Sequence, residues 1–234
     1  MARGAADALL ANRDETQAMP AHVGWYQILM IFFLWSIIGL FLEEGWVFIS
    51  MGLEQSRPGL VWGPFSPIYG FGAVLLTVVL RILERGGAST WRVFFASMLV
   101  GGLLEQTTGW VIERWLGAVS WDYIAGGIPG ALTKWVALPF LFAWGALGCL
   151  WGQVVLPCTL RAVGEPTTRL RVVFASVLAV FLVADILVTL SCFDRVAERE
   201  ADIPPANRLE ELVDEAFDDE FVARRFQNLE LNGR

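Results

Sequence analysis

The chain has 234 residues, of which 56% are hydrophobic and only 18% are charged, and its mean hydropathy is +0.55. Soluble domains carry about 25% charged residues, so this composition excludes an ordinary water-soluble domain and indicates an integral membrane protein. Its 11 tryptophans fit a chain with two lipid–water boundaries. The net charge of -7 reflects an acidic C-terminal end, and no basic surface points to a nucleic-acid partner.

Five apolar segments are long enough, at roughly 20 residues each, to cross the hydrocarbon core of a bilayer. We therefore expect an all-α, polytopic transmembrane helix bundle with about five spans. The expected spans are residues 24–49, 65–83, 92–113, 134–156 and 170–190. This arrangement divides the chain into a polar N-terminal segment (1–22), a transmembrane helical domain (23–192) and an acidic C-terminal tail (193–234).

The stretch 62–72 reads W-G-P-F-S-P-I-Y-G-F-G and combines prolines and glycines with apolar and aromatic residues. Irregular backbone at membrane depth is tolerated only where it is packed in protein or lines a cavity. We therefore expect a lid or re-entrant segment before the second span, together with the apolar loop 116–133. The lid residues expected are Gly63, Pro64, Pro67, Tyr69, Gly70, Gly72, Trp121 and Tyr123.

The fourth expected span contains Pro139, which should kink the helix or mark a distorted first turn. Beyond the fifth span, apolar residues recur among acids from Asn207 to Glu230, which suits a short amphipathic helix capped by Asn207 with Glu210 as its partner. A partly disordered acidic tail is an equally good interpretation.

The loops on the side of the N-terminus carry more Lys and Arg near the spans than those on the other side. The positive-inside rule then predicts a multi-pass plasma-membrane protein with a cytoplasmic N-terminus.

Charged groups inside membrane spans are costly and usually face the interior of the bundle. If the spans alternate in direction, the acids within them and several loop charges converge on one face of the membrane. The residues of this expected ligand or polar cluster are Glu43, Arg57, Glu105, Glu113, Asp122, Lys134 and Asp185. Three interpretations stay open: a structural ion-pair network, a transport or ligand pathway, and, least favoured, catalysis.

Two absences in the sequence limit the chemistry. There is no G-x-x-x-x-G-K-[ST] motif for ATP, and the only histidine, His22, precedes the first span. No His-based metal site and no nucleophile motif are therefore expected. We expect no metal and no cofactor, and the acids alone do not identify an enzyme.

Several short motifs occur in a recognisable order. They are S-I-I-G-L-F-L-E at 36–43, G-P-F-S-P-I-Y-G-F-G at 63–72, L-L-E at 103–105, I-E at 112–113, W-D-Y at 121–123, W-G at 144–145 with Pro157 closing that helix, and Asp185. In these the chain resembles the bacterial membrane family called putative ABC-transporter type IV, the CmpB-like putative ABC transporter permeases, over roughly residues 25–192. It departs where Ala125, Gly126 and Gly127 replace polar residues, where Lys134 stands for an arginine, and where Trp35 replaces a tyrosine.

The resemblance implies a permease-like membrane protein that acts as the membrane subunit of a transporter. Five spans are few for a complete importer, so the expected partners are the lipid bilayer and either further copies of the chain or a separate ATPase subunit. The alternative is a structural or accessory membrane protein whose buried charges fix helix packing. A membrane-embedded enzyme acting on a lipid or small metabolite is a weaker alternative.

Overall fold

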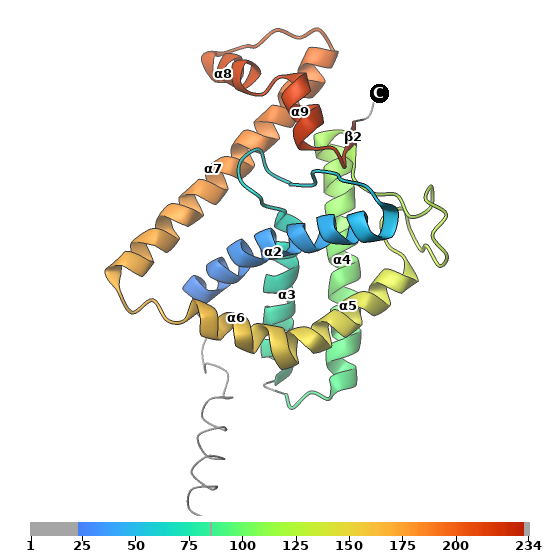
Figure 1. Cartoon of the computed structure of the whole chain (residues 1–234), viewed down its shortest axis with the longest axis vertical. Helices are drawn as coiled ribbons and strands as arrows, with labels where there is room; N and C mark the ends of the chain where they lie inside the picture. Colours follow the sequence, from blue (N-terminus) through green and yellow to red (C-terminus); the bar gives the residue numbers. More distant parts are fainter. Residues whose placement is uncertain (1–22, 85, 232–234) are drawn as a thin grey trace, which may run out of the picture.

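The computed structural model describes residues 23–84 and 86–231, so the expected polar segment 1–22 lies outside the described residues. The described chain is mainly helical and contains one two-stranded pairing (Figure 1). Its elements are α2 (Trp25–Met51), α3 (Pro67–Glu84), α4 (Thr90–Leu116), β1 (Ala118–Val119), α5 (Leu138–Leu150), the π-helical turn η1 (Trp151–Val155), α6 (Leu156–Val163), α7 (Arg169–Glu200), α8 (Arg208–Ala216), α9 (Asp219–Arg225) and β2 (Glu230–Leu231).

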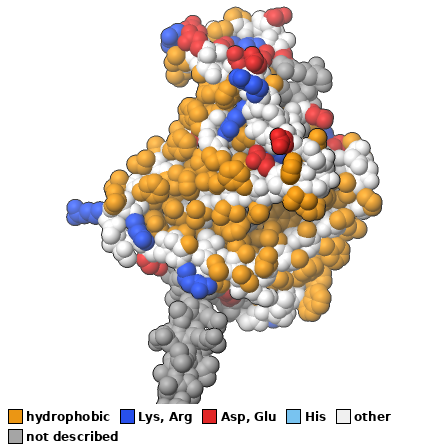
Figure 2. Space-filling view, viewed as in Figure 1, with side chains coloured by type: hydrophobic (Ala, Val, Ile, Leu, Met, Phe, Trp, Pro, Cys, Tyr) orange, Lys and Arg blue, Asp and Glu red, His pale blue; other side chains and the backbone are white. Residues whose placement is uncertain are grey.

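Four helical segments in the described part of the chain are long and apolar enough to cross a membrane: α2, α3, the run Leu138–Val163 and α7. Many of their large apolar side chains point outward, and Ile49, Leu170 and Val180 are 81%, 78% and 70% exposed. Figure 2 shows hydrophobic side chains over the body of the molecule, while charged side chains gather over the tail. Lipid is the solvent that suits so much apolar surface. The prediction of an all-α membrane bundle is confirmed.

The third expected span forms α4, which is 27 residues long and therefore about 40 Å at the helical rise. Unlike the other four, it is not among the segments apolar enough to be counted as a span, because Glu105-Gln106-Thr107-Thr108 interrupts its middle. It packs between α3 and α5. The structure thus has the five expected long helices, and the least apolar one carries Glu105.

The fourth expected span differs most from its prediction. It begins at Leu138, with Pro139 in the first turn, and it continues to Val163. The expectation that Pro157 closes this helix is wrong. The preceding turn, η1, is π-helical, and this wider turn accommodates a residue that lacks an N–H group, at the cost of the bend visible between α5 and α6 in Figure 1.

The irregular segment before the second span is residues 52–66. Helix α2 ends at Met51 and is capped by Gly52, whose φ of 68° is left-handed. Helix α3 begins at Pro67, where a fixed φ and a missing N–H suit a first helical residue. Pro67, Tyr69, Gly70 and Gly72 were expected in the lid, but they belong to α3. Only Gly63 and Pro64 of that set lie in the irregular part.

One buried apolar core joins α2, α3 and the bent helix. Ile31, Leu76, Trp151 and Leu156 form its buried centre. The indole N–H of Trp151 donates to Thr77 Oγ1 at 3.0 Å, so the one polar group of this buried ring is satisfied. Apolar packing therefore fixes α2, α3 and the bent helix against one another.

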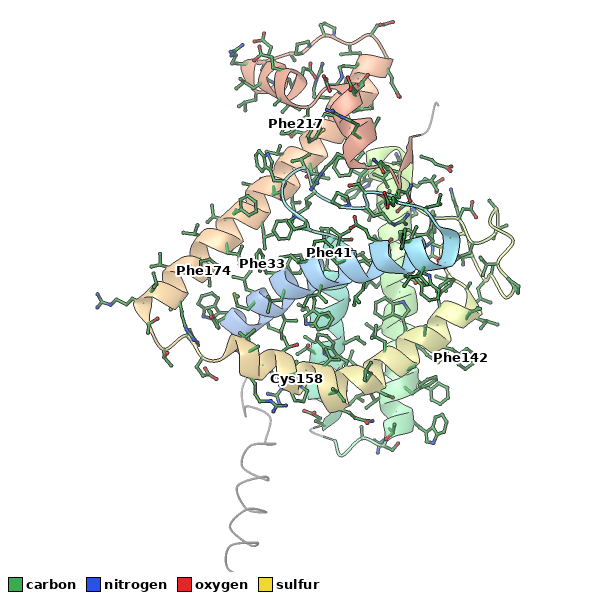
Figure 3. All side chains as sticks on the ribbon, viewed as in Figure 1. Phe33, Phe41, Phe142, Cys158, Phe174 and Phe217 are labelled. Carbon is green, nitrogen blue, oxygen red and sulfur yellow. The ribbon has the colours of Figure 1, made fainter. Side chains whose placement is uncertain are left out.

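The C-terminal tail folds back on the bundle. Helix α7 runs to Glu200, beyond the expected domain boundary at 192, and Asn207 caps α8 by accepting the N–H groups of Leu209 and Glu210, as predicted. The expected single helix is two, α8 and α9. Strand β2 pairs with β1 at the end of α4, and Figure 3 shows Phe217 at the base of the tail. The described tail is thus a docked structure over one end of the bundle.

Candidate functional site around Glu105

The structure places the predicted cluster residues in separate contact groups, which surround the irregular segment 52–66 and the loop 117–137. Three groups are pairs or local contacts, and two contain a buried carboxylate oxygen that accepts no hydrogen bond. The groups are Glu43 with Arg57, Glu113 with Lys134, Asp122 with its own loop, Glu105 with Trp144 and Tyr123, and Asp185 with the backbone of Trp62.

Glu105 lies in the middle of α4 and is only 8% exposed. Its Oε1 accepts the indole N–H of Trp144 at 3.1 Å and the Tyr123 hydroxyl at 3.5 Å. Its Oε2 is buried and accepts no hydrogen bond in the described structure. No Lys or Arg of the described residues forms an ion pair with it, so both donors to this carboxylate are neutral.

Two glycines on α4 bring aromatic rings onto the Glu105 face. A Cβ at Gly101 would lie 2.1 Å from Trp144 Cγ, so only glycine lets the indole approach closely enough to reach Glu105. A Cβ at Gly109 would lie 2.2 Å from Trp135 Cδ1. Gly109 therefore lets the Trp135 ring pack directly on α4.

Tyr123 reaches Glu105 from the loop that follows α4. Its ring stacks on Phe140 with centroids 4.6 Å apart and an interplanar angle of 10°, while its backbone N–H donates to the Lys134 carbonyl at 2.7 Å. Burial raises the pKa of the Tyr123 phenol well above its ordinary value, and the Glu105 charge raises it further. Tyr123 is therefore a fixed, protonated donor towards Glu105.

The Glu43–Arg57 pair ties α2 to the irregular segment. Arg57 Nε donates to Glu43 Oε1 at 2.7 Å, and the Arg57 backbone N–H donates to Glu44 Oε1 at 3.0 Å. The phenol of Tyr69 interacts with Glu43 from α3. Glu43 thus has a cationic partner, which Glu105 lacks among the described residues.

The Glu113–Lys134 pair closes the loop 117–137 onto the end of α4. Lys134 Nζ lies 2.5 Å from Glu113 Oε2, and both side chains are partly exposed. Gln106 lies about one helical turn before Gly109 on α4, and its Oε1 accepts the hydroxyl of Thr133 at 2.7 Å. Asp122 accepts the Ala125 N–H at 2.8 Å and so shapes a local turn, while the Trp121 indole donates to the Trp135 carbonyl.

Asp185 is fully buried in α7 beneath the irregular segment. Its Oδ1 accepts the backbone N–H of Trp62 at 3.1 Å, and Thr189, one turn later, accepts the N–H of Val61 at 3.0 Å. Like Glu105, it keeps one buried oxygen, Oδ2, without a hydrogen bond in the described structure.

Sequence reasoning missed three participants: Trp144, Thr189 and Arg225. Trp144 was noticed only as part of a W-G motif, and 39 positions separate it from Glu105. Thr189 had a usable signal, since it follows Asp185 by four positions on the same helical face. Arg225, which donates to the Leu60 carbonyl, had no such signal, because it lies in the acidic tail, 165 positions from Leu60.

Comparison with curated proteins and with solved structures gave no match. The sequence family described as Putative ABC-transporter type IV matches residues 30–190, more than two thirds of the 234 residues. The match contains Glu43, Glu105 and Asp185 and excludes the docked tail. This chain therefore belongs to the Putative ABC-transporter type IV family and is a membrane protein related to transporters.

Proposed function

We propose that the chain is a permease-like subunit of the plasma membrane in which Glu105 binds a cationic or polar solute. The observation that carries this proposal is the buried, unpartnered Oε2 of Glu105. Burying a carboxylate is costly unless cations or hydrogen-bond donors compensate it, and the two donors found here both serve Oε1. A bound cation or N–H donor at Oε2 gives the second carboxylate oxygen of Glu105 the partner that it lacks.

The surroundings support a site with controlled access. Trp144 and Tyr123 fix the carboxylate by donating to one oxygen, which leaves the other oriented and free to accept. Tyr123 belongs to the loop that Lys134 fastens to Glu113, so release of that pair would move one donor of the site. In this proposal the loop 117–137 is the lid, and the Glu43–Arg57 pair steadies the neighbouring segment.

The test is a thermal melt of the purified chain in detergent with methylammonium chloride as the probe. Tetraethylammonium chloride at equal ionic strength is the control salt, because its cation is too bulky for a buried carboxylate. We expect methylammonium to raise the melting temperature of the wild type, since a ligand stabilises the state that binds it. Glu105→Gln, which keeps the shape and removes the charge, should abolish that rise.

Glu54→Gln is the matched control, because Glu54 is exposed in the irregular segment. Equal shifts with the two salts, or a methylammonium shift retained in Glu105→Gln, would overturn the proposal. If Glu105→Gln unfolds, Glu105→Asp provides the second variant: it keeps the charge but retracts it, and should weaken the methylammonium shift.

A second function is favoured by a different observation: two ion pairs each join a helix to a loop, Glu43 to Arg57 and Glu113 to Lys134. In this alternative the chain is an accessory protein whose charges fix helix packing. Glu105 does not fit it well, since no described cation pairs with it. Loss of stability in Glu105→Gln together with no response to any cation would favour the accessory function.

We further propose a cytoplasmic N-terminus and, for an ATP-driven transporter, assembly with a separate ATPase or a second copy of the chain. If all five long helices cross the membrane, the loop between α6 and α7 then lies on the cytoplasmic side and the tail on the outside. Single cysteines at Thr167 and Glu215, both exposed, test this in a chain whose native cysteines are replaced. An impermeant maleimide applied to intact cells should label Glu215→Cys alone, and labelling of Thr167→Cys alone would reverse the orientation.

A further inference from the structure

The irregular segment presents two backbone carbonyls to one cation from the tail. The Leu60 carbonyl accepts Nε and Nη2 of Arg225 at 3.0 and 2.9 Å, and the Gly63 carbonyl accepts Nη2 as well. Three of the five guanidinium N–H groups are therefore used. The two on Nη1 have no hydrogen-bond partner among the described residues.

A buried carboxylate binds the backbone between those two carbonyls. Asp185 holds the same segment through the Trp62 N–H, and its Oδ2 is buried without a hydrogen bond in the described structure. The charges of Arg225 and Asp185 interact, although the two groups do not form an ion pair. Burial lowers the pKa of Arg225, while Asp185 and Glu44 act in the opposite direction. Two side chains whose charges interact thus keep one acceptor oxygen and two N–H donors without hydrogen bonds among the described residues.

The acceptors and the cation have different origins in the chain. Leu60, Gly63 and Asp185 all lie within the matched family region 30–190, whereas Arg225 lies in the tail outside it. The tail helix that carries Arg225, α9, has only 7 residues, and neighbouring polar contacts such as Gln55 to the Gln227 carbonyl are exposed. The family region therefore supplies the hydrogen-bond acceptors, and a segment outside that region supplies the guanidinium that donates to them.

We propose that residues 60–63 and Asp185 form a guanidinium-binding site, which Arg225 fills in cis and which accepts an external guanidinium cation when Arg225 is absent. A guanidinium suits it because a planar group with donors on three nitrogens spans two carbonyls and a carboxylate. An ammonium concentrates its donors on one atom and cannot. The site is distinct from Glu105 and does not depend on the function proposed for that residue.

Chemical rescue of the full-length chain tests this site. In Arg225→Ala, hydrogen exchange of the amides in residues 57–63 should speed up about tenfold or more, because the carbonyls that order this segment lose their donor. Ethylguanidinium chloride should restore slow exchange at about 10 mM, a concentration near the effective molarity that a short tether provides. Ethylammonium chloride at the same concentration should not restore it.

Three matched variants make the outcome decisive. Arg224→Ala should leave exchange unchanged, because Arg224 is exposed and pairs only loosely with Glu220, at 3.8 Å. The double variant Arg225→Ala with Asp185→Asn should no longer respond to ethylguanidinium. Arg225→Gln should respond as Arg225→Ala does, and it serves if the alanine variant aggregates.

No rescue in either Arg225 variant, equal rescue by ethylammonium, or full rescue without the Asp185 charge would each overturn the proposal. The first result would mean that Arg225 only attaches the tail to residues 60–63 and that no external guanidinium binds there. The second would make the site a general cation site, and the third would remove Asp185 from it.

Discussion

Gly39 of α2 lies against Tyr69 of α3 so closely that a Cβ on Gly39 would be 2.3 Å from both Cβ and Cγ of the tyrosine. This contact places the Tyr69 phenol beside Glu43, one turn further along α2. The close approach of α2 and α3 therefore sets the position of a group that interacts with the Glu43–Arg57 pair.

Gly39→Ala should destabilise the protein by about 1–3 kcal/mol, the usual cost of adding a methyl group to a closely packed contact. Gly45→Ala is the matched control on the same helix, since nothing lies within 4 Å of the Cβ it would add. That change should be neutral or stabilising by up to about 1 kcal/mol, because alanine favours helix over glycine. Melting curves in one detergent compare the two, and a smaller loss for Gly39 than for Gly45 would contradict the packing described.

Trp144→Phe should destabilise the protein by about 1–3 kcal/mol, because it removes the shorter of the two hydrogen bonds to a buried carboxylate. The phenylalanine still occupies the space above Gly101, so most of the packing survives. Trp46→Phe, at a position 66% exposed, is the control and should change stability little. Comparable melting temperatures for the two variants would mean that the indole does not hold Glu105.

The helices could be predicted because apolar runs of about 20 residues have few alternatives to a membrane helix. Hydropathy gave α2, α3 and α7 closely, although it stopped α7 early, since the polar turns after Cys192 are buried by the tail and not by lipid. It could not anticipate the π-helical turn at 151–155, which comes just before Pro157. A proline in a sequence marks a disturbance of a helix, not whether the helix ends there.

The site was predictable only in part, for a related reason. Costly residues such as Glu105 and Asp185 stand out in apolar segments, whereas their partners do not. Trp144 is one of 11 tryptophans, and Arg225 is separated from Leu60 by 165 positions. Helical periodicity relates residues three or four apart. Contacts between helices distant in the chain, and between the tail and the loop, follow from tertiary packing alone.

The two loop-to-helix ion pairs should differ in strength. The side chains of Arg57 and Glu43 are 16% and 21% exposed, against 27% and 36% for Lys134 and Glu113. A double-mutant cycle of Glu43→Gln with Arg57→Gln should give a coupling of about 1–3 kcal/mol, because solvent screens this pair less. The cycle of Glu113→Gln with Lys134→Gln should give about 1 kcal/mol or less. The reverse order would show that exposure does not govern these pairs.

Docking of the tail should depend on acid pH through Asp214. Its carboxylate accepts three hydrogen bonds from Arg195, which is only 2% exposed, because Nε donates to both oxygens and Nη2 to one, and it accepts a further one from Arg199. The hydrogen bonds from Arg195, and to a smaller extent the one from Arg199, hold the pKa of Asp214 below its ordinary value. A carboxyl with a lowered pKa in the folded state stabilises that state above its unfolded pKa of about 3.9, and the stabilisation is lost as the pH falls through the lowered value.

Hydrogen exchange of residues 208–225 should therefore stay slow from about pH 7 to pH 5 and, after correction for the intrinsic exchange rate, become faster below about pH 4. Asp214→Asn should exchange faster already at neutral pH, because a neutral amide no longer compensates the buried guanidinium of Arg195, and most of the acid response should vanish. Glu215→Gln is the control, since Glu215 is exposed and forms only a 3.8 Å contact with Arg208. An acid response of full size in Asp214→Asn would assign the titration to the other carboxylates paired with these arginines, Glu198, Glu210 and Asp219. The absence of any acid response in the wild type would assign the docking to the apolar contacts of Phe217, Val222 and Phe226 with α7, which carry no charge to titrate.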